Sequence, residues 1–122
     1  MKRVYLDNCC YNRPYDDQSQ LRISLESQAK FDIQARIKNG EIELATSYMT
    51  FYENSENPYE MRRKSIRDFQ EKNAVIHLSS DSDDAVNKKA IEIEATGIKH
   101  KDACHVACAI FTESDYLLTT DD

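Results

Sequence analysis

Short apolar runs alternate along this chain with longer segments whose apolar residues recur every three or four positions. The runs have the length and composition of buried strands and are found at 3–6, 43–46, 74–78 and 116–119. Helices are predicted at about 21–39, from 48 to beyond 53, at 59–72, 82–96 and 102–112. Strands that alternate with helices predict a parallel sheet covered on both faces. The expected fold is therefore α/β, a three-layer α/β/α sandwich with a mainly parallel central sheet.

Length and composition restrict the number of domains and the compartment. A chain of 122 residues suffices for one core, so we expect a single domain over 1–122. Two glycines and two prolines are too few for the many tight turns of an all-β protein. The chain has neither an apolar run of membrane-spanning length nor a signal-peptide core. A cytoplasmic protein with no membrane partner is therefore predicted.

The net charge is −6, whereas a protein that simply coats nucleic acid is usually basic. This charge argues against passive electrostatic binding of nucleic acid. It leaves a metal-dependent nuclease open, because such an enzyme carries several acidic ligands whose charge the bound ions offset in part.

The four cysteines match none of the common zinc-binding spacings. They are Cys9, Cys10, Cys104 and Cys108. We expect all four to be reduced and partly buried thiols, which pack as small apolar side chains.

The helix predicted at 21–39 is marked by an apolar stripe with a period of four residues. The stripe consists of Leu21, Leu25, Ala29, Ile33 and Ile37. Asp17 or Ser19 is expected to cap the start of this helix, and Gly40 is expected to end it.

Four carboxylates from distant parts of the chain are expected at one edge of the predicted sheet. They are Asp7, Glu53, Asp102 and Asp121. Asp7 and Asp121 follow apolar strands, and the other two lie on helices that can begin near the same edge, where ligands bind in such folds. Carboxylates that converge repel one another, and a divalent cation would stabilise them. Taken singly, Glu53, Asp102 and Asp121 are also explained as a surface group, a helix cap and a turn residue, whereas Asp7 is harder to explain in this way because it adjoins a buried strand.

Two groups of basic residues, Arg62 with Arg63 and the single His105, each allow two interpretations. Arg62 and Arg63 belong to a basic helical cluster that could contact RNA phosphates or pair with acids on its own surface. His105 shares a helical face with Asp102, from which it is three residues away. It could contact a metal or substrate, or pack as a partly buried histidine near the site.

Several strings that contain the four acids resemble motifs of one protein family. They are Tyr5-Leu6-Asp7-Asn8-Cys9-Cys10 with Asn12-Arg13-Pro14, Leu44-Ala45-Thr46-Ser47 leading to Glu53, Lys101-Asp102-Ala103-Cys104-His105-Val106-Ala107-Cys108-Ala109, and Tyr116-Leu117-Leu118-Thr119-Thr120-Asp121. They are similar to the acidic motifs of the PIN-domain family of metal-dependent ribonucleases, which includes the VapC-type toxins. The resemblance reaches almost the whole chain, and the third string is the most specific.

The resemblance implies a PIN-like domain that hydrolyses RNA phosphodiester bonds with Mg²⁺ or Mn²⁺. It assigns catalytic and metal-binding roles to Asp7, Glu53, Asp102 and Asp121. It also implies the toxin of a toxin–antitoxin pair, with a cognate antitoxin protein and a homodimer as partners.

Two positions depart from the family pattern, and the first of these departures, together with the acidic net charge, keeps an alternative open. The chain stops at Asp122, where the family usually continues with another strand or helix, which leaves open a domain shortened at its C-terminus. Asn8 stands where the family often has Thr or Ser near its first acid. The alternative is a catalytically silent PIN-like module that binds a partner protein.

Overall fold

The computed structural model describes residues 1–12, 14, 16 and 18–119. Its elements, in chain order, are β1 (Arg3–Leu6), α1 (Asn8–Asn12), α2 (Leu21–Lys38), β2 (Glu43–Ser47), α3 (Tyr48–Ser55), α4 (Glu60–Asn73), β3 (Ala74–Leu78), the 3₁₀ turn η2 (Ser80–Ser82), α5 (Asp83–Glu94), α6 (His100–Phe111) and β4 (Tyr116–Leu118). Among these helices, none combines the length and apolar character that a bilayer span requires.

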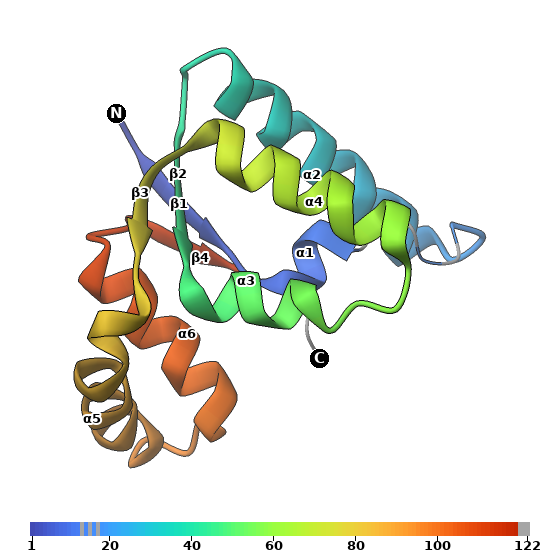
Figure 1. Cartoon of the computed structure of the whole chain (residues 1–122). Helices are drawn as coiled ribbons and strands as arrows, with labels where there is room; N and C mark the ends of the chain where they lie inside the picture. Colours follow the sequence, from blue (N-terminus) through green and yellow to red (C-terminus); the bar gives the residue numbers. More distant parts are fainter. Residues whose placement is uncertain (13, 15, 17, 120–122) are drawn as a thin grey trace.

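The four strands form one sheet in the order β3-β2-β1-β4, and all neighbouring strands are parallel (Figure 1). In the centre, Tyr5 of β1 is in register with Ala45 of β2 and Leu117 of β4. The chain builds β2 and β3 on one side of β1 and returns to place β4 on the other. The order therefore reverses beside β1, which is the position where open α/β sheets bind ligands at the carboxyl ends of their strands.

Helices cover both faces of the sheet, with α2 and α4 on one side and α5 and α6 on the other (Figure 1). Side chains alternate along β1, because successive residues of a strand point to opposite faces. Tyr5 packs with Val86 and Ala90 of α5 and with the small residues of α6. Val4 and Leu6 pack on the opposite face against α1, α2 and α4. The predicted three-layer α/β/α sandwich is confirmed.

Two predicted helix boundaries are confirmed by their local hydrogen bonds. Ser47 ends β2 and is the N-cap of α3: its side chain accepts a hydrogen bond from the Thr50 backbone N–H, while its own N–H donates to Thr50 Oγ1. Gly40 follows α2 with a φ of 75°. This left-handed conformation favours glycine and ends the helix.

Other boundaries differ from the prediction. A short helix, α1, begins directly after Asp7, where the sequence pattern is too short to show periodicity. Helix α6 begins at His100, so Asp102 is inside its first turn instead of opening it. Gln20 precedes α2 as its N-cap without a side-chain hydrogen bond, so Ser19 is not its cap. Asp17 lies outside the described residues.

The apolar stripe of α2 packs over only part of its length. Ile37 is buried, but Leu21 is 75% exposed and Leu25 is 54% exposed. A helix of 18 residues is about 27 Å long, whereas the five residues of β2 span about 17 Å. The N-terminal half of α2 therefore extends past the sheet that it would have to cover.

Candidate functional site

Three of the four predicted acids line one cavity of about 210 Å³ at the carboxyl ends of the strands. Its lining consists of Asp7, Asn8, Cys9, Glu53, Lys101, Asp102 and His105. Asp7 follows β1 directly, Glu53 lies on α3, and Asp102 lies on α6. The fourth predicted acid, Asp121, lies outside the described residues.

Asp7 is a buried carboxyl group, with only 8% of the residue exposed. Its Oδ1 accepts hydrogen bonds from the Cys9 backbone N–H at 3.1 Å and from the Cys9 thiol at 2.6 Å. Burial raises the pKa of Asp7 to about 7, and the hydrogen bond with the thiol adds to the rise. The site thus holds a carboxyl group that is costly to ionise without a nearby positive charge.

Glu53 has two basic neighbours. Its Oε1 is in a very short contact with His105 Nε2, and its Oε2 lies 3.4 Å from Lys101 Nζ. Burial acts to raise the pKa of Glu53, but the hydrogen bond with His105 and the charge of Lys101 outweigh it, so the pKa falls below its ordinary value. Glu53 is therefore ionised at neutral pH.

A buried hydrogen-bonded chain fixes the orientation of His105. The Tyr5 hydroxyl lies 2.8 Å from His105 Nδ1 and 2.7 Å from Ser47 Oγ. Because an ionised carboxylate only accepts hydrogen bonds, His105 Nε2 must donate to Glu53. In the neutral imidazole, Nδ1 then accepts from the Tyr5 hydroxyl, whose oxygen accepts from Ser47. The ends of β1 and β2 are thus linked to the acid on α3.

Tyr5→Phe is expected to lower the free energy of unfolding by about 1–3 kcal/mol, because it leaves buried polar atoms of Ser47 and His105 without their partner. Urea unfolding at neutral pH measures the change. The matched control is Tyr48→Phe, whose hydroxyl donates to the exposed Asp83 at 2.8 Å and should matter less. Equal losses of stability in the two variants would contradict this role of Tyr5.

Asp102 lies in the first turn of α6, where the partial positive charge of the helix N-terminus favours a carboxylate. Asp102 is thus inside the helix and is not its cap, since the N-cap of α6 is Lys99. Asp102 also lines the same cavity as Asp7 and Glu53. A role at the helix N-terminus alone would not require this position.

The cavity has the donor chemistry of a site for a hard divalent cation. It offers carboxylate oxygens and Asn8 Oδ1, a buried oxygen with no hydrogen-bond partner among the described residues. Within that same part of the chain, however, no three His, Cys, Asp or Glu side chains are grouped closely enough to hold a metal ion. Glu53 instead pairs with Lys101 and accepts a hydrogen bond from His105. The donors fit Mg²⁺ or Mn²⁺ by type, and the metal site itself stays a prediction.

The two arginines predicted to contact RNA lie at the start of α4 and do not line the acidic cavity. Arg63 Nη1 donates a hydrogen bond to the Asn57 carbonyl at 2.8 Å, and the Arg62 guanidinium lies 4.4 Å from the centre of the Tyr59 ring. Their role in RNA binding stays a prediction. Lys101 was not predicted from the sequence, since only the fold brings it next to Glu53.

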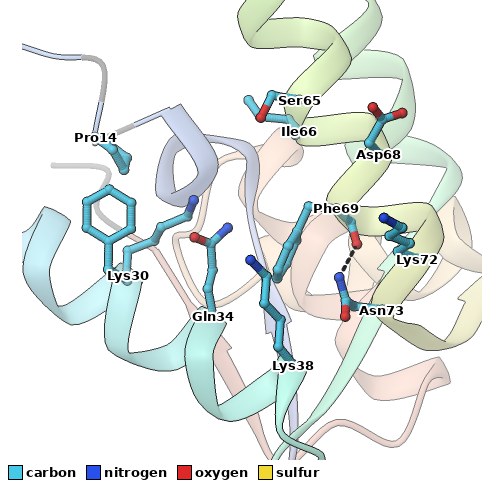
Figure 2. A pocket seen from close by; sticks show the side chains of 11 residues that line it. Pro14, Lys30, Gln34, Lys38, Ser65, Ile66, Asp68, Phe69, Lys72 and Asn73 are labelled. Carbon is cyan, nitrogen blue, oxygen red and sulfur yellow. Dashed lines mark hydrogen bonds between the residues drawn. The ribbon is translucent and has the colours of Figure 1, made fainter.

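A separate cleft of about 440 Å³ lies between α2 and α4 (Figure 2). Lys30, Gln34 and Lys38 line it from α2, and Phe69 and Lys72 line it from α4 (Figure 2). Burial, together with the nearby charge of Lys38, lowers the pKa of Lys30 to about 8. This cleft contains none of the predicted acids, so it is not the site that the sequence pattern identified.

The fold and the cavity define a parallel α/β domain with an acidic site at its strand ends. Protein-family models and curated proteins give no match to this chain. Three of the four cysteines are buried and Cys9 is partly buried, as expected of side chains that pack as small apolar groups.

Proposed function

We propose that this protein is a metal-dependent endoribonuclease of the PIN-like type, the toxin of a toxin–antitoxin pair. The observation that carries the proposal is the common cavity of Asp7, Glu53 and Asp102, which are far apart in the sequence. The reaction, the toxin role and the inclusion of Asp121 are supported by the resemblance of the four acidic strings to PIN-domain motifs.

The proposed reaction assigns a task to each group in the cavity. Asp7, Glu53 and Asp102 supply oxygen ligands for Mg²⁺ or Mn²⁺. When bound, the ion supplies a polarised water and neutralises charge at the scissile phosphate. Lys101 has a side chain that is 70% exposed, so its ammonium group can pair with a phosphate oxygen. Asn8 Oδ1 is free to accept a hydrogen bond from a water in the cavity.

Partner and compartment belong to the same proposal. Free thiols are stable in a reducing cytoplasm, which supports a cytoplasmic location. The exposed Leu21 and Leu25 of α2 provide apolar surface that an antitoxin or a second copy of the chain could cover.

A second candidate is the catalytically silent PIN-like module that binds a partner protein. The observation that favours it is the engagement of Glu53 by Lys101 and His105, together with the lack of a metal-holding group among the described residues. In a silent module Glu53 would need no cation, because Lys101 already pairs with it.

Metal binding and RNA cleavage together separate these two functions. The endoribonuclease should cleave RNA with Mg²⁺ or Mn²⁺ and lose this activity in EDTA, and its melting temperature should rise with metal concentration. At a metal concentration of 100 times Kd, the expected stabilisation is about 2.7 kcal/mol. Glu53→Gln, purified identically, controls for contaminating nucleases. If neither metal supports cleavage and neither shifts the melting temperature, the result favours the silent module.

A further inference from the structure

A second cleft, of about 460 Å³, opens directly beside the acidic cavity. We call it the α3–α6 cleft, and its lining includes Tyr48, Met49, Tyr52, Asn87, His100 and Cys104. Glu53 and Lys101 line both this cleft and the acidic cavity. The two cavities are therefore adjacent, and the pair formed by Glu53 and Lys101 stands at their boundary.

The α3–α6 cleft offers an aromatic surface to solvent. Tyr52 is 66% exposed, which leaves its ring available for stacking. Tyr48 is held in place because its hydroxyl donates to Asp83 Oδ1 at 2.8 Å. Asn87 is also fixed, since its Nδ2 donates to the Asp83 carbonyl at 3.0 Å. A rigid wall with one exposed aromatic ring is the arrangement on which single-stranded nucleic acids stack their bases.

The charges along the cleft favour an uncharged group over a phosphate. Asp83 and Glu53 both line it, and their carboxylates would repel an anion. Lys101 stands at the boundary with the acidic cavity, 3.4 Å from Glu53 Oε2. A phosphate is thus better placed beside Lys101 and a base is better placed deeper in the cleft.

We propose that the α3–α6 cleft binds the nucleobase of the nucleotide next to the scissile phosphate, and that the ring of Tyr52 stacks on this base. The proposal rests on the ribonuclease function proposed above. A volume of about 460 Å³ is in the range of sites for small ligands. Helix α3 has eight residues and is about 12 Å long, so its wall suits one flat ring better than a long partner helix.

The test compares Tyr52→Ala with Tyr116→Ala, a matched loss of an exposed tyrosine that does not line the cleft. Binding of a fluorescent single-stranded oligoribonucleotide is measured by anisotropy in EDTA, and cleavage of the same RNA is measured with Mn²⁺. Tyr52→Ala removes one base–aromatic stack and should therefore bind the RNA about tenfold more weakly than the wild-type protein. We expect KM to rise by a similar factor with little change in kcat. Tyr52→Phe keeps the ring and should retain the affinity.

The base-binding cleft and the ribonuclease function are tested by different results. Equal RNA affinities for Tyr52→Ala and Tyr116→Ala overturn the base-binding cleft, even where the wild-type protein cleaves RNA. A wild-type protein that cleaves no RNA with either metal overturns the ribonuclease function, while the anisotropy measurement still decides whether the cleft binds a base. Melting temperatures of all variants confirm that each one is folded.

Discussion

Asp102→Asn is expected to reduce metal-dependent RNA cleavage by more than about a hundredfold. Loss of even an indirect partner of a metal ligand commonly costs about 10–100-fold in metal affinity or activity, and Asp102 is proposed as a direct ligand. The substitution keeps the size of the side chain and removes its charge from the acidic cavity. Initial rates with saturating Mg²⁺ and a defined RNA measure the loss.

The control for this variant is Asp84→Asn. Both acids lie in the first turn of a helix, so both substitutions remove a favourable charge at a helix N-terminus, worth about 0.3–1 kcal/mol. Asp84 is exposed and does not line the acidic cavity. The two variants should therefore have similar stabilities and very different activities. Full cleavage by Asp102→Asn would exclude Asp102 from the catalytic site.

Asp7→Asn should be more stable than the wild-type protein at pH 8 in EDTA. Burial raises the folded-state pKa of Asp7 from 3.8 to about 7, so the folded protein binds an extra proton between these values. Its stability therefore falls as the pH rises from about 4 to about 7, through ionisation of Asp7. The shift corresponds to about 4 kcal/mol at most. Solvent screening reduces the expected gain from Asp7→Asn to about 2 kcal/mol.

Urea unfolding of the two proteins in EDTA at pH 8 and pH 4 measures this difference, which should nearly vanish at pH 4. The asparagine retains Oδ1 as an acceptor for the Cys9 backbone N–H, so local structure should persist. Added Mn²⁺ should stabilise the wild-type protein and leave Asp7→Asn little changed, because the variant lacks the charged ligand. A variant less stable than wild type at pH 8 in EDTA would show that Asp7 is not under electrostatic strain.

Local patterns were sufficient to predict the layers of this fold. The apolar runs that became β1 and β3 match the predicted ranges because a buried strand needs a continuous apolar segment. The helix predicted from residue 48 begins there, and Ser47 is its N-cap. Asp7, Glu53 and Asp102 were predicted to converge because parallel strands all end at one edge, and they line one cavity there.

Features that depend on packing between distant segments were not predictable in the same way. The stripe of α2 correctly indicated a helix, but the sheet is too short to cover Leu21 and Leu25. The contact between Tyr5 and His105 joins residues 100 positions apart, and no periodicity connects them. The partnership of Lys101 with Glu53 likewise depends on how α6 lies against α3.

One hydroxyl group couples the start of α3 to the interior of the sheet. Ser47 Oγ caps α3 through Thr50 and also contacts the Tyr5 hydroxyl, which leads through His105 to Glu53. Fraying of the first turn of α3 would break this contact as well as the cap. The orientation of Glu53 and the integrity of α3 therefore belong to one cooperative unit of local unfolding. Thermal opening of the first turn of α3 would therefore also release the contacts that orient Glu53 in the cavity.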